Sequence, residues 1–256
     1  MPRLHRQFMR VMLEEIASGD LEDAGRLPSE AELAERFSVS RGVIRECFRG
    51  LEERGVVTVR QGSGARVNPE AEWNVLDADV LAAMLRRGNA AAALFELLEC
   101  RKVIEVEAAG LAALRSSGED LARLSDALAR MVAAAERVHR QRTAEDLFHA
   151  ADIAFHEAIF RAARNRALLR MVQPLQQTLI NARRPLARPE KRFERALPEH
   201  KAILRGIASR DPQAARDAMR AHLETVEQYL RTYAEQHPGP AFAEGLELDG
   251  IEARFG

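Results

Sequence analysis

The sequence predicts a mainly α-helical protein in two parts: three helices and a β-hairpin at the N-terminus, then an all-α antiparallel helical bundle. Apolar residues recur at helical spacing along most of the 256 residues, which indicates amphipathic helices. The period changes once, within residues 56–67, where short β-branched runs flank a glycine-rich stretch. A chain of this length has room for two domains.

Capping residues set the bounds of the N-terminal helices. Ser29 opens the second helix and Glu32 follows three residues later, as in a capping box. Ser40 caps the third helix, and Gly55 stops it. The helices are expected near residues 4–18, 29–37 and 40–54.

The β-hairpin follows directly. Residues 56–59 and 65–67 are its expected strands, and residues 61–64, Gln-Gly-Ser-Gly, are its tip. Three helices followed by such a hairpin is the element order of a winged helix-turn-helix, which is a DNA-binding fold. We therefore assign residues 1–68 to a DNA-binding domain.

DNA binding has to be argued from the placement of charge, because the bulk charge gives it no support. The net charge is −1, and residues 1–68 hold eleven arginines against eleven acidic residues. Arg41, Arg45 and Arg49 are spaced by four, so they share one face of the third helix. Taken alone, such a row is more simply a solvated helix face. Together with the turn, the capping Ser40 and the wing, it favours a recognition helix that bonds guanine edges and phosphates.

Beyond the hairpin, every substantial segment has helical periodicity. Residues 69–76, which include Trp73, are expected to be a linker, and residues 77–236 an all-helical domain. Residues 237–256 contain prolines, glycines and scattered acids and are expected to be disordered. Pro198 is expected to kink or break its segment. Helices are expected near residues 77–87, 91–116, 119–140, 144–163, 166–184, 191–209 and 212–235.

Four side chains in the C-terminal part have the chemistry of a metal site. Asp152 and His156 lie four apart on one expected helix and face the same way, while His200 and His222 belong to later helices. One carboxylate and three imidazoles, if they converge, suit Zn²⁺ or another divalent transition metal such as Ni²⁺ or Mn²⁺. A single helical histidine is more often a core or surface residue, and the spacing of the last two is not diagnostic.

Residues 27–67, LPSEAELAERFSVSRGVIRECFRGLEERGVVTVRQGSGARV, resemble the DNA-binding domain of the GntR family. The family pattern, LPSE-x-x-LA, then VSR-x-x-VRE-x-L and a Gly-rich wing, is matched nearly throughout. The resemblance implies DNA contacts by Arg41 and Arg45 and by the wing near Gly62. Ala31 stands where many relatives carry an arginine, so one of their contacts is missing here. The full set expected at DNA is Ser29, Ser40, Arg41, Arg45, Arg49 and Gly62.

Residues 76–235 resemble the FCD domain, the all-helical ligand-binding domain of the FadR subfamily. Metal-binding members share a D-x-x-x-H helix, an EH-x-x-I segment and a closing A-x-x-x-M-x-x-H-L helix, all present here. The resemblance implies a metal held by Asp152, His156, His200 and His222.

Arg101 lies in a strongly apolar helical stretch, so its charge needs a partner. An internal ion pair with Glu105 or another acid is one explanation. The resemblance implies another, in which Arg101 pairs with the carboxylate of an organic-acid effector beside the metal. The string WNVLDADVL, residues 73–81, is similar to that of members that answer to sugar acids. An aldonate or a similar sugar acid is therefore the expected effector.

These observations predict a transcription regulator, most simply a repressor, that binds a short palindrome of double-stranded operator DNA as a homodimer. Two alternatives stay open: a metal-sensing regulator without an organic effector, and a metal-dependent hydrolase fused to a DNA-binding head. Against the hydrolase, Phe160 stands where a zincin has its second histidine, and no other clear general base is evident. The sequence has two cysteines and no apolar run of membrane-spanning length, so we expect no membrane partner and a cytoplasmic location.

Overall fold

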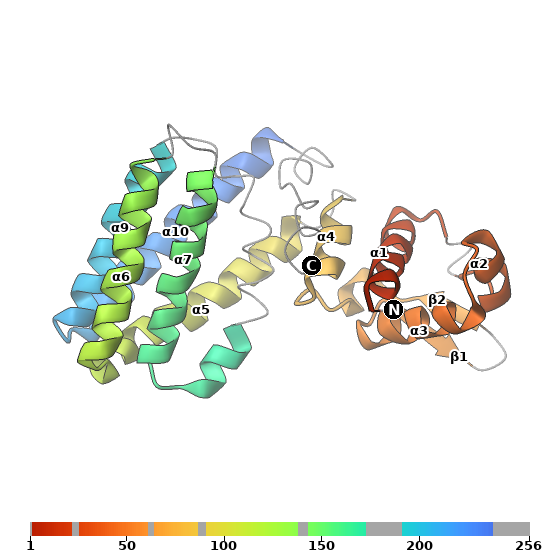
Figure 1. Ribbon diagram of the computed structural model, residues 1–256, viewed down its shortest axis with the longest axis horizontal. Helices are drawn as coiled ribbons and strands as arrows, with labels where there is room; N and C mark the ends of the chain where they lie inside the picture. The colour runs from red at the N-terminus through yellow and green to blue at the C-terminus, as the bar shows by residue number, and fades with distance from the viewer. Residues whose placement is uncertain are drawn as a thin grey trace. The chain divides into compact units, whose positions relative to one another are not determined.

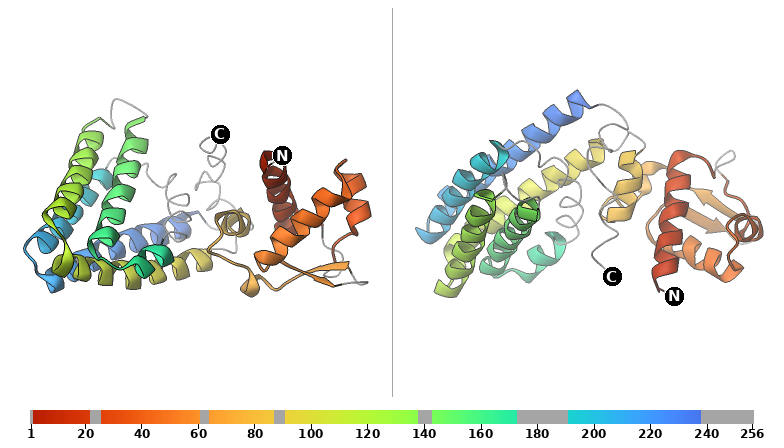
Figure 2. Two further views of the ribbon diagram at one scale, coloured as in Figure 1. Left: turned by 60° about the horizontal axis from the view of Figure 1, so that its bottom comes forward. Right: turned by 45° about the horizontal axis from the view of Figure 1, so that its top comes forward.

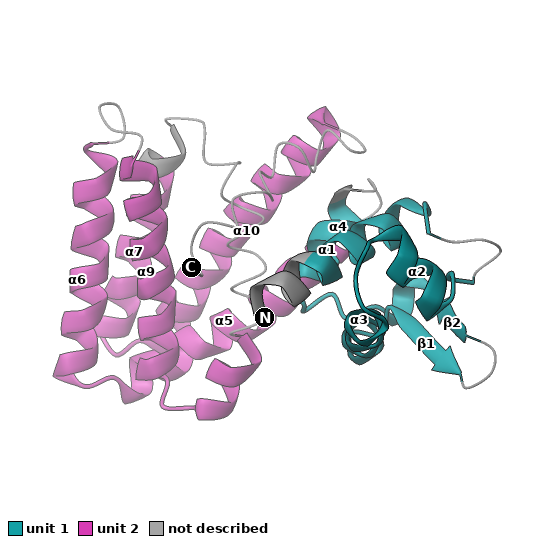
Figure 3. Ribbon diagram, turned by 45° about the vertical axis from the view of Figure 1, so that its right-hand side comes forward, with its two compact units in different colours: residues 1–90 teal, residues 91–256 magenta. Residues whose placement is uncertain are grey.

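The computed structural model describes residues 2–21, 26–60, 64–86, 91–137, 143–172 and 191–237. The chain divides into two compact units, residues 1–90 and residues 91–256 (Figure 3). The wing tip with Gly62, the expected helix beyond residue 172 and the tail after His237 lie outside the described residues.

The first unit opens with the expected helices (Figure 1). Both predicted caps are present. The Ser29 hydroxyl accepts a hydrogen bond from the Glu32 N–H at 3.3 Å, and the Glu32 carboxylate accepts one from the Ser29 N–H at 2.8 Å. The Ser40 hydroxyl accepts from the Val43 N–H at 3.3 Å. The helices are α1 (Pro2–Ser18), α2 (Glu30–Arg36) and α3 (Arg41–Glu53). Their fully buried apolar side chains include Met12, Ile16, Leu33, Ile44 and Leu51.

The wing is a two-stranded antiparallel sheet of β1 (Val57–Arg60) and β2 (Gly64–Val67). Its register pairs Val57 with Val67 and Arg60 with Gly64. Val57 and Ala65 are buried, whereas Val59, which pairs with Ala65, is exposed. Arg26 adds an isolated bridge to Arg66, so the chain before α2 runs beside β2.

The segment expected to be a linker is packed against the first unit. Trp73 is buried, and its indole N–H donates to the Asn68 carbonyl oxygen at 2.9 Å. Gly55 has a φ of +72°, and a Cβ there would lie 2.3 Å from the carbonyl oxygen of Glu72 in the short 3₁₀ helix η1 (Glu70–Glu72). Helix α4 (Ala78–Arg86) follows and contacts α1. An ion pair joins the two helices, with Nη2 of Arg10 3.4 Å from Oδ1 of Asp79. The first unit therefore includes α4.

The second unit is built from long helices, some of which run side by side while others cross them at an angle (Figure 2). The closest packing joins α6 with α7, α5 with α10, and α9 with α10. Helix α6 ends before residue 140, and α9 continues through Pro198, so that proline does not break it. Residues 166–172 are also helical. The helices are α5 (Ala91–Arg115), α6 (Gly118–Ala135), α7 (Thr143–Ala162), α9 (Lys191–Ala208) and α10 (Pro212–Gln236).

Across the described residues, no helix combines the length and apolar composition that crossing a lipid bilayer requires.

Candidate metal centre and DNA interface

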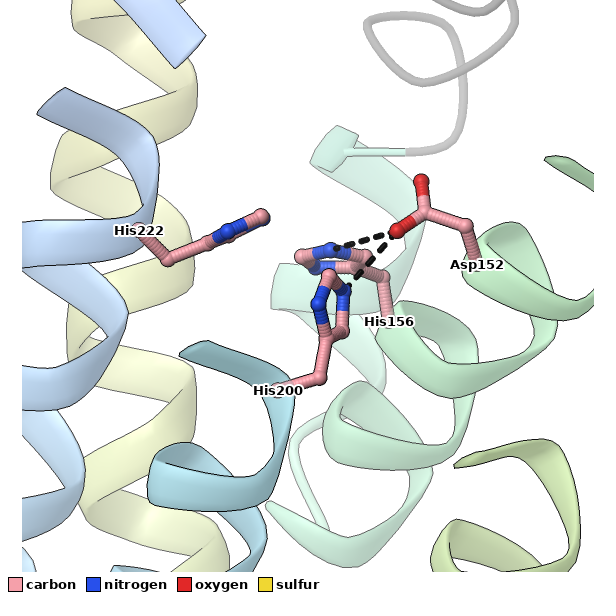
Figure 4. Close-up of side chains that lie close together, drawn as sticks. All are labelled: Asp152, His156, His200 and His222. Atoms are coloured by element: carbon pink, nitrogen blue, oxygen red, sulfur yellow. Dashed lines mark ion pairs between the residues drawn. The ribbon is translucent and has the colours of Figure 1, made fainter. Parts of the chain in front are cut away.

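Three helices of the second unit bring the predicted ligands together (Figure 4). Asp152 and His156 lie one turn apart on α7, while His200 comes from α9 and His222 from α10. One ligand atom from each of the four lies within 4.8 Å of the others. All three histidines are buried, and Asp152 is half-buried. The structure therefore brings together the four residues that the sequence could only name.

Each histidine ring is held at Nδ1 by a hydrogen-bond acceptor. Carboxylates and carbonyls accept hydrogen bonds, so each Nδ1 carries the proton and each Nε2 presents its lone pair. The three partners are Glu105 for His156, the Ala196 carbonyl at 2.8 Å for His200, and Glu199 at 2.8 Å for His222. This tautomer is the one that binds a metal through Nε2.

The three Nε2 atoms point into the cluster and are buried without a hydrogen-bond partner. The Nε2 of His200 lies 2.9 Å from Oδ1 of Asp152, and the Nε2 of His156 lies 3.8 Å from the same oxygen. Neither contact has the geometry of a hydrogen bond. Buried nitrogen acceptors without a donor are costly, and three of them converging beside a carboxylate fit a cation.

The electrostatics of the cluster suit a divalent metal. Burial alone would raise the pKa of Asp152, but the contact with His200 and the other neighbouring imidazoles hold it well below its usual range. Burial and the charges of His200 and His156 push the pKa of His222 well below its ordinary value. Burial would also lower the pKa of His200, but Asp152 outweighs it and raises that pKa. Metal binding at such a cluster would depend on pH, because a metal competes with protons for the imidazole nitrogens.

Arg101 is buried on α5 and forms an ion pair with Glu105 one turn later. The other carboxylate oxygen of Glu105 contacts His156, so this acid joins the arginine to the metal cluster. Burial by itself would raise the pKa of Glu105, but Arg101 and His156 outweigh it and lower the pKa to about 2. The internal ion pair considered from the sequence is present.

Sequence reasoning missed two residues of this centre, the carboxylates that hold His156 and His222. Glu105 was considered only as a partner of Arg101, and Glu199 only as part of the EH-x-x-I segment. A signal for Glu105 was available, because an acid in an apolar helical stretch needs a buried partner. No local signal marks Glu199, whose partner lies 23 residues away on another helix.

In the first unit, α3 separates an apolar face from an arginine face, as predicted. Arg41, Arg45 and Arg49 are exposed. The buried face is Ile44, Cys47, Phe48 and Leu51. Ser29 and Ser40 are exposed and use their hydroxyls as caps. A capped helix that presents an arginine row after a tight turn has the form of a major-groove reader.

Two of the three arginines are paired with acids. Arg45 makes two bonds to Glu30 of α2, from Nη2 to Oε2 at 3.0 Å and from Nε to Oε1 at 3.3 Å. Nε of Arg49 lies 3.3 Å from Oε1 of Glu53 in the same helix. Glu30 was not among the residues singled out from the sequence.

A three-helix unit with a hairpin wing, joined in sequence to a helical unit with a buried ligand cluster, defines a winged-helix regulator with a sensory domain. The family models agree: the model for bacterial regulatory proteins of the gntR family matches residues 8–67, and the FCD domain model matches residues 96–225. The chain belongs to the GntR family and carries an FCD domain.

The relatives of this chain are regulators. It is 32% identical over 208 residues to the galactonate operon transcriptional repressor of Escherichia coli (strain K12), covering 80% of this chain and 87% of that protein. It is 32% identical over 227 residues to the HTH-type transcriptional regulator LutR of Bacillus subtilis (strain 168), with 87% and 99% covered. Regulators of this family bind operator DNA, and FCD domains bind small effectors. The chain is a DNA-binding transcriptional regulator and not an enzyme, so the hydrolase alternative is set aside.

One solved structure supports the fold. Lar, which controls the expression of the Listeria monocytogenes agr system, superposes with a TM-score of 0.60 at 20% identity, covering 88% of this chain and 95% of that one.

Proposed function

We propose that this regulator is a repressor whose operator binding is modulated by a sugar acid, such as an aldonate, bound beside a divalent metal. The convergence of three buried Nε2 atoms on one carboxylate carries the proposal. Zn²⁺ is the favoured metal, with Ni²⁺ and Mn²⁺ as alternatives. The metal would be held by Asp152, His156, His200 and His222. When bound, it supplies a positive centre for effector oxygens.

Arg101 is the proposed anchor for the effector carboxylate. Its bond to Glu105 uses Nε, and a guanidinium has further N–H donors on its terminal nitrogens. A planar fork of this kind suits two-point recognition of a carboxylate. The choice of a sugar acid is supported by the regulators that the chain resembles. One is the galactonate operon repressor, and another is the Uxu operon transcriptional regulator of Escherichia coli (strain K12), 32% identical over 216 residues.

The proposed response is a population shift in a homodimer. Two copies of α3 and of the wing would contact two half-sites of a palindrome, with Ser29, Ser40, Arg41, Arg45, Arg49 and Gly62 at the DNA. The effector would favour the arrangement of the DNA-binding units that fits the operator less well. Only a difference in effector affinity between the two arrangements is required.

A metal-sensing regulator without an organic effector is the second candidate. The ion pair between Arg101 and Glu105 favours it, because the buried arginine already has a charge partner. On this alternative, Arg101 is structural and the metal alone changes operator affinity.

Thermal denaturation with added ligands tests the proposal and separates the two candidates. The metal-free protein is melted with and without Zn²⁺, Ni²⁺ or Mn²⁺, each in the presence and absence of galactonate and related aldonates. We expect the metal to raise the melting temperature, and a sugar acid to raise it further only when metal is present, because ligands that bind the folded state stabilise it.

Three variants assign these effects to residues. His222→Ala should lose the metal response, and Arg101→Ala should keep the metal response and lose the sugar-acid response. A metal response that survives in both His200→Ala and His222→Ala contradicts the site. Operator release by metal alone, with no effect of any acid, supports the metal sensor instead.

A further inference from the structure

The three arginines of α3 are held in three different ways. Arg41 has no ion-pair or hydrogen-bond partner among the described residues. Arg49 is paired with Glu53 of the same helix, and both side chains are mostly exposed. Arg45 alone is held from another helix and at two atoms, Nε and Nη2, by Glu30 of α2. Among the three, Arg45 is therefore the one whose orientation is set by the body of the domain.

The chemistry of this pairing leaves the reading edge of the guanidinium available. Glu30 accepts from Nε and from one of the two N–H groups of Nη2. The second N–H of Nη2 and those of Nη1 form the terminal edge of the guanidinium, which stays open. That terminal edge is the one that can bond O6 and N7 of a guanine at two points. The Arg45 side chain is 71% exposed, so DNA can reach it.

Glu30 can hold the Arg45 side chain in place because its own helix, α2, is fixed by its N-cap and by its buried residues. Ser29 caps α2 through the capping box with Glu32, and Leu33 and Ala34 are buried. Helix α2 packs directly against α3. The Glu30 side chain is 32% exposed, less than half the exposure of its partner.

We propose that Glu30 is a specificity-determining positioning residue, which holds the Arg45 guanidinium so that its terminal edge reads a guanine, while the unrestrained Arg41 contacts phosphate. The inference rests on the proposed function, in which α3 is the recognition helix. Base readout needs a fixed donor pair, whereas a phosphate contact tolerates movement. The Glu30 carboxylate would also repel the phosphates of DNA. This repulsion weakens binding to sites that offer Arg45 no guanine. A surface ion pair adds little to folding stability. Discrimination between base pairs therefore explains the pair of Glu30 and Arg45 better than folding stability does.

The test measures base preference and affinity separately. Duplexes are selected from a randomised DNA pool with the wild-type protein, and affinities for a selected and a scrambled duplex are measured at several salt concentrations. Glu30→Gln should lower the ratio of the two affinities by at least about fivefold, with the lost preference confined to one base pair per half-site.

Two arginine variants locate the effect. Arg45→Lys should relax the same base pair without a change in salt dependence, because it keeps the charge and loses the fork. Arg41→Ala should weaken both duplexes alike and reduce the salt slope by about one.

Glu32→Gln is the matched control. It removes the same charge from α2, does not touch Arg45, and keeps the capping box, which accepts glutamine at this position. It should leave the affinity ratio unchanged, and melting curves should show that all variants are folded. Equal losses for Glu30→Gln and Glu32→Gln would mean that only bulk charge matters, which overturns the positioning role.

The remaining outcomes separate this inference from the assignment of α3. If Arg45→Lys shifts the base preference and Glu30→Gln does not, the inference fails and the recognition helix stands. If Arg45→Lys leaves the base preference intact, Arg45 does not read that base and the proposed role of α3 fails first.

Discussion

At the scale of single residues, the metal centre depends on the groups that hold its histidines as well as on the histidines. Glu199 fixes the ring of His222, and the Ala196 carbonyl fixes that of His200. Such partners set the tautomer and the ring plane, and their loss commonly lowers metal affinity by about 10- to 100-fold.

The first prediction concerns Glu199. Glu199→Ala should weaken Zn²⁺ binding by about tenfold or more while the four ligands stay in place, because His222 loses the acceptor at Nδ1. Competition with a chromophoric chelator measures the affinity. Glu224→Ala removes the same charge from the exposed side of α10 and should bind as the wild type does. Equal affinity of the two variants would contradict the role of Glu199.

The second prediction is a pH dependence that arises from Glu105. Its pKa is lowered from 4.5 to about 2, so its charge stabilises the folded state above pH 4.5, and that stabilisation is lost as the pH falls toward 2. Glu105→Gln leaves Arg101 buried without its counter-charge and should cost about 3 kcal/mol near neutral pH.

Melting curves of the metal-free proteins check this prediction. The gap between wild type and Glu105→Gln should be widest near pH 6 and should shrink toward pH 3. A gap that stays constant over this range would show that the Glu105 charge is not the source.

At the scale of elements, the helix bounds in the first unit were predictable because they depend on local chemistry. Ser29, Ser40 and Gly55 act on neighbouring backbone, and the predicted ends of α2 and α3 agree with the structure within a residue. The packing of residues 69–76 was not predictable in this way, since it depends on the burial of Trp73 and on its hydrogen bond to the Asn68 carbonyl. The domain bounds expected from the sequence remain a prediction.

The third prediction tests that junction. Gly55→Ala should destabilise the first unit by about 2 kcal/mol or more, because φ is positive and the new Cβ would meet the Glu72 backbone. Trp73 is the single tryptophan of the chain and is buried here, so its fluorescence reports urea unfolding of this unit. Gly42→Ala, on α3, should be neutral or stabilising, because the nearest atom to its new Cβ is the Ser40 hydroxyl oxygen at 3.7 Å. A similar unfolding midpoint for both variants would argue against the close contact.

At the scale of the whole molecule, the two units carry different parts of the function. The resemblance to FCD motifs named all four residues of the candidate metal centre, yet spacing alone could not bring His200 and His222 to Asp152. Their convergence depends on how α7, α9 and α10 pack, as do the contacts of Glu105 and Glu199. Tertiary contacts between distant helices therefore supplied what local patterns lacked.

The fourth prediction follows from this division. Arg45→Ala should abolish specific operator binding and leave the Zn²⁺ affinity of the helical unit unchanged, because the substituted side chain belongs to the other compact unit. Fluorescence anisotropy with labelled operator and a metal titration measure the two properties in one preparation. A large change in metal affinity, or retention of specific DNA binding, would contradict it.

The carboxylate shared by Arg101 and His156 has a thermodynamic consequence. Glu105 contacts Arg101, the proposed effector anchor, with one oxygen and His156, a proposed metal ligand, with the other. In the proposed function, a sugar acid that engages Arg101 changes how strongly Glu105 supports His156, and so changes the metal affinity by some factor. Linkage then requires the metal to change the affinity for the acid by the same factor. The metal supply of the cell would thus set the acid concentration at which the operator is released.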